Sequence, residues 1–478
     1  MNASVDISAR RALCVDLDGT LVRADLLHES VLALARLNPL LLFLLPFKLM
    51  GGKAALKRWL AERVTLDVAA LPYNDELIAF LHAERAKGRM LVLVTASDER
   101  CAQAVADHLG LFAAVMASDG ETNLAGRHKA RALSERFDAF DYAGNSRDDV
   151  AVWDAAHTAF VVGDAAAARA YAGQTGARRF PHPAKSRAKV WAKALRLHQW
   201  LKNGLVFVPL VLSGFVFDWS LWLTSGLAFL AFGLCASSVY LLNDLLDVEA
   251  DRRHATKRRR PIASGLVSVP QAVVSAALCL GGAAALAAFL PLAFAGVLLL
   301  YYVSTLAYSL VLKRKMLVDV LTLAGLFTMR VLAGAAALGL GVSAWLLGFC
   351  IFFFLSLALV KRYVELAREA PAACGKVAGR GYMPGDIEVV SQAGLASGFA
   401  AVVVLALFVD APAMRAAYAR PELMWLICPL VLYMLLRIWM LARRGQMNDD
   451  PIVFLLTDWR SLVLTAMGAG LMLTAKLA

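Results

Sequence analysis

Long apolar runs beyond residue 204 constrain the fold of this chain more than any other feature. Each run has about the 20 residues that an α-helix needs to cross the hydrocarbon core of a bilayer, and polar loops separate the runs. We expect nine spans, near residues 203–217, 220–243, 268–290, 292–312, 317–340, 344–363, 391–411, 423–442 and 456–476. This part of the chain is therefore predicted to be an all-α polytopic membrane domain of about nine transmembrane helices.

The first part of the chain has a different pattern. A length of 478 residues exceeds one ordinary core, and up to about residue 184 polar and apolar residues mix as they do in a soluble domain. We predict a soluble domain at 1–180, a linker with an interfacial amphipathic helix at 181–202, and the membrane domain at 203–478.

The net charge of +12 has a membrane explanation. Lys and Arg gather in alternate loops between the spans, which is typical of loops on the cytosolic side. The chain begins without the apolar core of a signal peptide, so the soluble domain is expected in the cytosol. The positive charge is therefore assigned to membrane topology, and no nucleic-acid partner is expected.

Polar side chains recur every three or four residues where the second apolar run ends; they are Asn243, Asp244, Asp247 and Asp251. This spacing places them on one helix face close to the bilayer, where unpaired carboxylates would repel one another. Oxygen ligands in this number suit Mg²⁺ completed by substrate phosphates. Lys257 and Arg260 follow and add positive charge for the same phosphates. The alternative is an ordinary acidic helix end before a positively charged cytosolic loop.

This NDxxDxxxD element, with the lysine and the Arg-Pro-Ile of residues 260–262, resembles the first signature of the UbiA superfamily of intramembrane prenyltransferases. The resemblance covers roughly residues 187–478. It implies that Asp244, Asp247 and Asp251 hold Mg²⁺ on a diphosphate, with Asn243 beside them.

The second UbiA signature is incomplete. Tyr308 and Lys313 precede Asp319, but Leu323 stands where the second aspartate of a DxxxD element is expected. One fewer carboxylate leaves a more positive cavity, which suits a donor that carries more phosphate than a plain prenyl diphosphate.

Three further segments, at 195–209, 359–366 and 379–382, are similar to the polyprenyl-phosphate phosphoribosyltransferase branch of the superfamily. The resemblance implies phosphoribosyl pyrophosphate as donor, a polyprenyl phosphate as acceptor, pyrophosphate as leaving group and a bacterial-type inner (cytoplasmic) membrane as location. Basic residues in these loops could also be positive-inside charges alone. The residues expected to bind substrate in this domain are Lys202, Asn203, Asn243, Lys257, Arg260, Tyr308, Lys313, Asp319, Arg330, Lys361, Arg362 and Arg380.

A short apolar strand at 12–15 runs into the DxDGT sequence of residues 16–20. Two carboxylates spaced in this way allow Asp16 to attack phosphorus while Asp18 handles the proton of the leaving group. A second strand ends at Thr95, Lys129 follows later, and a further strand leads into Asn145 and Asp149.

These ordered elements resemble the haloacid dehalogenase-like phosphatase superfamily over about residues 8–175. The resemblance implies an α/β Rossmann-like fold with a helical cap at 25–80. It also makes Thr95 and Lys129 phosphate binders, and Asp16, Asp18, Asn145 and Asp149 the Mg²⁺ site. Asn145 departs from the usual aspartate, so a fold without phosphatase activity is an alternative.

The two sites in one chain suggest that the phosphatase removes the 5-phosphate of the lipid product. The competing readings are an aromatic prenyltransferase that uses a prenyl diphosphate, and a non-enzymatic transporter or anchor. The apolar stretch at 37–46 is too short to span and contains prolines. It either rests the cap on the membrane or packs inside the cap.

Overall fold

A computed structural model describes residues 11–181, 186–369, 381–447 and 450–477. The chain divides into two compact units, which are taken separately. The N-terminal unit comprises Met1–Ala194 together with Leu241–Ser275, and the helical unit comprises Leu195–Tyr240 and Ala276–Ala478. The predicted boundaries at 180 and 202 remain predictions, but the segment 241–275 groups with the soluble domain.

The N-terminal unit is built on a six-stranded parallel sheet in the order β3-β2-β1-β4-β5-β6. Apart from β6, which begins with the exposed Arg178 and Arg179, its strands contain short apolar runs, as expected for a sheet that is covered on both faces. The strands are β1 (Ala12–Val15), β2 (Leu91–Asp98), β3 (Ala114–Ser118), β4 (Phe140–Gly144), β5 (Thr158–Val162) and β6 (Arg178–Phe180).

Helices cover both faces of this sheet, and alternate strand residues point to opposite faces. Leu13 and Val15 pack against α4 and α5, whereas Ala12 and Cys14 pack against α6, α7 and α8. These helices are α4 (Asp75–Ala86), α5 (Glu99–Leu109), α6 (Gly126–Arg136), α7 (Val150–Ala155) and α8 (Ala166–Thr175). The predicted Rossmann-like α/β fold is confirmed.

The predicted helical cap lies between β1 and β2 and has a small core of its own. Its elements are α1 (Leu26–Leu37), the 3₁₀ helix η2 (Pro39–Leu44), α2 (Leu45–Leu49) and α3 (Lys53–Ala61). Asp25 caps α1 by accepting hydrogen bonds from the backbone N–H groups of Leu27 and His28. A short 3₁₀ turn, η3 (Val68–Ala70), leads back to α4.

The other part of the N-terminal unit joins two long apolar helices. It contains the end of α11 (Trp219–Leu246), then α12 (Val248–Arg253), η5 (Lys257–Arg259) and the start of α13 (Val269–Ala287).

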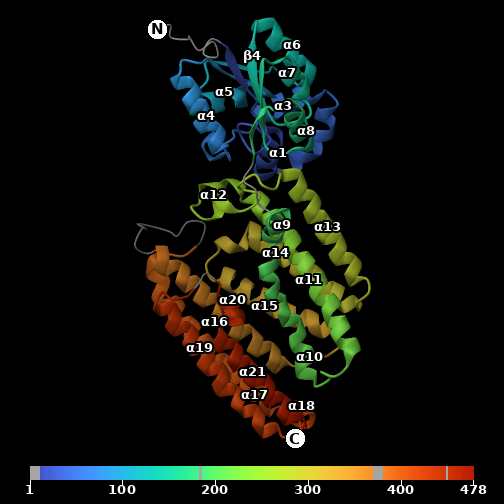
Figure 1. Cartoon of the computed structure of the whole chain (residues 1–478). Helices are drawn as coiled ribbons and strands as arrows, with labels where there is room; N and C mark the ends of the chain where they lie inside the picture. The colour runs from blue at the N-terminus through green and yellow to red at the C-terminus, as the bar shows by residue number, and fades with distance from the viewer. Residues whose placement is uncertain (1–10, 182–185, 370–380, 448–449, 478) are drawn as a thin grey trace. The chain divides into compact units, whose positions relative to one another are not determined.

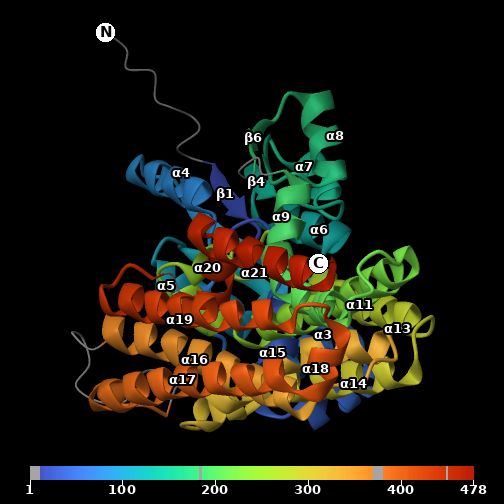
Figure 2. The ribbon, with the colours of Figure 1, turned by 90° about the horizontal axis from the view of Figure 1, so that it is seen from below.

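The helical unit is all α. Seven helices of the described residues are long and apolar enough to cross a membrane, and the bent pair α20–α21 makes eight if it counts as one span. Besides α11 and α13, the elements are α14 (Leu292–Leu310), α15 (Val318–Ala337), α16 (Ala344–Glu369), α17 (Ile387–Asp410), α18 (Pro412–Ala417), α19 (Ile427–Arg443), α20 (Pro451–Thr457) and α21 (Trp459–Leu477). In both views α16, α17 and α19 run side by side (Figures 1 and 2).

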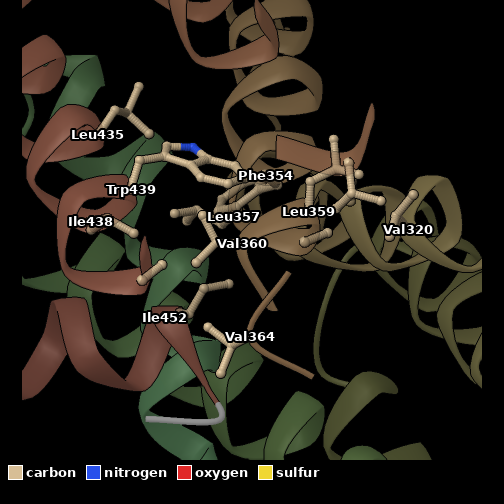
Figure 3. Packing of buried hydrophobic residues seen from close by; sticks show 14 of the residues in the cluster. Val320, Phe354, Leu357, Leu359, Val360, Val364, Leu435, Ile438, Trp439 and Ile452 are labelled. Atoms are coloured by element: carbon tan, nitrogen blue, oxygen red, sulfur yellow. The ribbon is translucent and has the colours of Figure 1, made fainter. Parts of the chain in front are cut away.

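A buried apolar cluster holds α15, α16, α19 and α20 together. Trp439 and Ile438 of α19 lie beside Leu357 and Val360 of α16 (Figure 3). The Trp439 indole donates a hydrogen bond to Ser356 Oγ at 3.1 Å, so its polar group is satisfied inside the cluster.

The span expected at 203–217 is not a single helix. The chain there forms η4 (Leu197–Phe207) and α10 (Val208–Ser213), which ends at Gly214 with a positive φ of 75°. Pro209 cannot donate a backbone hydrogen bond, and this left-handed glycine stops the helix. Within 181–202 the chain forms the helix α9 (Arg187–Ala194), and its place at the membrane interface stays a prediction.

Candidate functional sites

The phosphatase motifs meet at the carboxyl edge of the sheet. Asp16 follows β1, Thr95 lies near the end of β2, and Asn145 follows β4. Because β2, β1 and β4 are adjacent parallel strands, their carboxyl ends lie at the same edge of the sheet. Open α/β sheets bind ligands at this edge.

Asp16 is buried, with 6% of its surface exposed. It accepts hydrogen bonds from Lys129 Nζ at 2.7 Å and from Thr20 Oγ1 at 3.0 Å. Burial raises the pKa of Asp16 to about 7, while the charge of Lys129 opposes that rise. The contact with Lys129 is therefore what favours the ionised, nucleophilic form.

Asp18 has a different environment. It accepts hydrogen bonds from the Leu26 backbone N–H at 2.8 Å, from Ser97 Oγ at 2.6 Å and from Thr95 Oγ1 at 3.3 Å. Burial raises its pKa, and the charge of Asp25 adds to the rise. A raised pKa suits a carboxyl group that gives a proton to a leaving oxygen.

Asp149 orders the loop after β4. It accepts hydrogen bonds from the backbone N–H groups of Asn145 and Ser146, at 3.0 and 2.9 Å, and from the Tyr142 hydroxyl at 2.6 Å. Burial raises the pKa of Asp149, but Lys129, 3.6 Å away, and these hydrogen bonds leave it below the usual value. Asp149 is thus ionised and fixes both the loop and the Lys129 ammonium.

The side chain of Asn145 packs directly on the DxDGT loop. Gly19 has a positive φ of 74°, and any Cβ there would collide with the Asn145 amide. Asn145 is therefore placed beside the backbone of Gly19, next to Asp18, and its amide oxygen is of the kind that binds hard cations.

Among the described residues, no group of three or more His, Cys, Asp or Glu side chains converges as a preformed metal site. Lys129 forms ion pairs with both Asp16 and Asp149, so its ammonium supplies the positive charge between the two carboxylates. The oxygen atoms gathered here still suit a hard cation, and Asp16, Asp18 and Asn145 are its candidate ligands.

Three residues at this site were not predicted from the sequence. Ser97 lies two residues after Thr95, so strand alternation could have placed it on the same face. Tyr142 is one aromatic residue in an apolar strand, and Lys57 is one lysine in a cap helix. Lys57 Nζ donates to the Ala96 carbonyl at 2.5 Å.

The segment 241–275 carries the aspartate motif. The helix is interrupted at Asp247, but the backbone N–H of Asp247 still bonds to Asn243 O at 2.9 Å and that of Asp251 to Asp247 O at 2.8 Å. The helical spacing of the motif is therefore kept across the break.

Arg260 bridges the two ends of this motif. Its Nη1 donates to Asp244 Oδ1 at 3.0 Å and to Asp251 Oδ2 at 2.6 Å. Asp244 and Asp251 are both buried. Burial raises the pKa of Asp251, and Arg260 counters the rise. Both carboxylates thus contact one guanidinium group, so the motif brings two carboxylates to one point, while Lys257 is exposed in η5.

The cap contacts this same segment through ion pairs, two of which involve α1. Arg252 donates to Glu29 Oε2 and Oε1 at 3.0 and 2.7 Å, and both side chains are 6% exposed. Arg36 pairs with Glu249 at 2.9 Å and donates to the Leu245 carbonyl at 3.1 Å.

Glu29→Gln should lower the free energy of unfolding by about 3 kcal/mol, because it leaves the buried Arg252 charge uncompensated. The control is Arg253→Gln, which alters the neighbour of Arg252 on α12. Arg253 is 69% exposed and pairs with Asp67 at 2.6 Å, so its loss should cost below about 1 kcal/mol. Thermal unfolding in detergent, followed by tryptophan fluorescence, compares the two. Equal losses of stability in the two variants would show that the ion pair of Glu29 and Arg252 contributes no more than an exposed one.

The helical unit holds two further polar clusters. Lys202 forms an ion pair with Asp450, and Lys361 lies near enough to interact with both. Arg330 donates to Asn203 Oδ1 and to the Tyr301 hydroxyl, each at 3.0 Å. Four residues expected from the sequence (Lys202, Asn203, Arg330 and Lys361) are therefore in polar clusters of this unit.

Asp319 has a buried cation as its partner. Arg362 Nη2 lies 2.5 Å from Asp319 Oδ2, each with 1% of its side chain exposed, and the Tyr382 hydroxyl donates to Asp319 Oδ1 at 2.7 Å. Arg362 also pairs with Glu365. The structure thus brings Asp319 and Arg362 together, tying α15 to α16. Tyr308 and Lys313 lie at the end of α14 and in η6 (Leu312–Arg314), and Arg380 is outside the described residues.

Arg362→Gln should destabilise the membrane domain by roughly 3–5 kcal/mol, because Asp319 is left charged without its partner. Adding Asp319→Asn should recover part of this loss, since the uncompensated charge is removed. Heating in detergent followed by size-exclusion chromatography measures the two single variants and the double variant. If the double variant loses as much stability as the two single variants lose together, the two residues do not neutralise each other.

Comparison with known proteins agrees with this architecture. Residues 205–462 match the UbiA prenyltransferase family, which is more than half of the chain. The chain belongs to the UbiA prenyltransferase family. Residues 13–154 match the haloacid dehalogenase-like hydrolases, so this UbiA protein carries a hydrolase domain at its N-terminus. It is a multi-pass membrane enzyme with transferase and hydrolase domains.

The relatives differ in how much of their own length this chain covers. The uncharacterized protein y4nM of Sinorhizobium fredii is 40% identical over 95% of this chain and 89% of its own length. The nodulation protein NoeC of Azorhizobium caulinodans is 37% identical over 57% of this chain and 89% of its own. The decaprenyl-phosphate phosphoribosyltransferase of Mycolicibacterium smegmatis is 39% identical over 38% of this chain and 59% of its own.

Proposed function

We propose that this enzyme transfers a 5-phosphoribosyl group from phosphoribosyl pyrophosphate to a polyprenyl phosphate, and that its hydrolase domain then removes the 5-phosphate of the lipid product. The observation that carries the transfer step is the bridge from Arg260 to Asp244 and Asp251, because it brings two carboxylates and a guanidinium to one point. The similarity to decaprenyl-phosphate phosphoribosyltransferases supports transfer of a phosphoribosyl group to a polyprenyl phosphate.

Asp244, Asp247 and Asp251 are the residues that would hold Mg²⁺, which would neutralise charge on the departing pyrophosphate. Arg260 exchanges its carboxylate partners for the diphosphate, and Lys257 adds a second positive charge. An oxygen of the lipid phosphate attacks the anomeric carbon of ribose, and the bond from that carbon to pyrophosphate breaks. The attacking oxyanion is already nucleophilic, so no separate base is needed.

The charge of the helical unit favours a donor rich in phosphate. The aspartate of the incomplete second signature, Asp319, is neutralised by Arg362 within the protein. Lys202 pairs with Asp450, and the charges of Lys361 and Arg330 act on Lys202 as well. A plain prenyl diphosphate has two phosphate groups, whereas the proposed donor has three.

The hydrolase step uses a separate set of residues. Asp16 attacks the phosphorus of the 5-phosphate, and Asp18 gives a proton to the departing ribose oxygen. Lys129 and Thr95 hold the transferring phosphoryl group, and water then releases phosphate from Asp16. Both sites act from the cytosolic side of an inner membrane.

Donor competition in purified protein tests this assignment. The enzyme in detergent with Mg²⁺ and polyprenyl phosphate receives either ribose-labelled phosphoribosyl pyrophosphate or a labelled prenyl diphosphate with an aromatic acceptor. Ribose label in the lipid phase supports the proposal. Prenyl label on the aromatic acceptor would replace it with aromatic prenyl transfer, and label in neither product would favour a transporter or anchor.

A further inference from the structure

We propose that the exposed apolar face of the cap segment Pro39–Met50 inserts into the interfacial region of the phospholipid bilayer, so that the hydrolase domain carries its own membrane contact. The segment consists of η2, α2 and Met50.

The segment has two apolar faces. Leu41, Leu42 and Leu45 are partly buried against the small core of the cap. Phe43 and Phe47 are 75% and 70% exposed on the other side. Also exposed there are Leu40 at 69%, Leu44 at 42%, Leu49 at 49% and Met50 at 85%. No residue of η2 or α2 is buried, so packing inside the cap accounts for only one of the faces.

The start of this segment is held at the end of a membrane-spanning helix. Arg36, in the last turn of α1, donates to the carbonyl of Leu245 and pairs with Glu249. Leu245 is in the last turn of α11, one of the helices that can cross the membrane. Three extended residues cover at most about 11 Å, so Pro39 lies within roughly that distance of Arg36. The apolar face therefore begins within about 11 Å of a side chain that contacts the end of α11.

Other contacts fix this placement. Arg252 and Glu29 form the buried ion pair between α12 and α1. A Cβ at Gly265 would lie 2.6 Å from the backbone oxygen of Arg23, so the loop before α13 approaches the start of the cap closely. The cap is thus joined to the loop that connects two spans, and its apolar segment has a lipid surface within reach.

The composition of the segment fits lipid better than a protein groove. Its exposed side chains are aromatic and aliphatic, and the exposed basic residues Lys48 and Lys53 lie at its end. Segments that lie in the interface combine such an apolar face with lysines that reach the anionic headgroups. A contiguous apolar patch on an otherwise polar domain commonly marks a membrane or protein contact, and this one adjoins a membrane helix end.

Photo-crosslinking in lipid nanodiscs tests the proposal without relying on either catalytic activity. The full chain is reconstituted in phosphatidylethanolamine and phosphatidylglycerol with p-benzoylphenylalanine in place of Phe43 or Phe47. This change keeps an aromatic side chain and therefore the fold. The control places the same probe at Met90, which is 42% exposed in the same unit but outside the segment.

After irradiation, mass spectrometry counts phospholipid adducts at each position. We expect adducts at positions 43 and 47 to exceed those at position 90 by at least about tenfold, because the first two side chains lie among acyl chains. Equal yields at the three positions would overturn the proposal. Crosslinks from positions 43 and 47 to a second copy of the chain, in place of lipid, would overturn it as well.

Discussion

Asp251→Asn is expected to lower the rate of ribosyl transfer roughly 10²–10³-fold, the usual effect of removing one charged group that acts on the reacting centre. Asp251 shares Arg260 with Asp244, so its loss removes one of the two carboxylates that converge on the cationic centre. Hydrolysis of a water-soluble phosphate ester by the N-terminal domain should stay within about twofold, because Asp251 has no part in that chemistry. Both rates are measured on one preparation.

The matched control is Asp218→Asn. Asp218 precedes α11, the helix that carries Asp244, and its side chain caps the start of that helix by accepting hydrogen bonds from Ser220. Transfer by this variant should resemble that of the unchanged protein. An active Asp251→Asn enzyme, or a loss of transfer as large in Asp218→Asn, would refute the role given to the aspartate motif.

Asp16→Asn is expected to lower phosphatase activity roughly 10³-fold or more, because the attacking carboxylate becomes an amide. Ribosyl transfer should continue, so the lipid that still carries its 5-phosphate should accumulate. Thin-layer chromatography of the labelled lipids, with and without added alkaline phosphatase, identifies this intermediate.

An exposed carboxylate of the same domain provides the control for this variant. Asp107→Asn alters an exposed residue on α5 whose side chain accepts a hydrogen bond from Gln103. It should yield the dephosphorylated lipid as before. If purified Asp16→Asn protein also yields that lipid, the attached hydrolase domain is not the enzyme that removes the phosphate.

The hydrolase fold follows from local patterns in the sequence. Asp16 and Asn145 directly follow β1 and β4, and Thr95 lies three residues before the end of β2. These strands are adjacent in a parallel sheet, so the three residues lie at one edge of it. The aspartate motif is similar, because three- and four-residue spacing survives the break at Asp247. Such features depend on neighbours along the chain, which the sequence displays directly.

Other features depend on partners that are distant in sequence. Nothing around Asp319 indicates that Arg362 neutralises it, and nothing around Glu29 points to Arg252. A basic residue near a membrane helix end reads equally well as a phosphate ligand, a topological charge or half of an ion pair. The span expected near 203–217 failed for a local reason, since Gly204, Pro209 and Gly214 divide an otherwise apolar run.

Double-labelled donor tests the central claim most directly. Phosphoribosyl pyrophosphate with ¹⁴C in ribose and ³²P in the 5-phosphate is incubated with the full chain, Mg²⁺ and polyprenyl phosphate, and the lipid phase is followed over time. We predict that both labels enter the lipid together, and that ³²P then leaves as inorganic phosphate while ¹⁴C remains. If the protein is folded and the lipid still never acquires ¹⁴C from the donor, the account is contradicted.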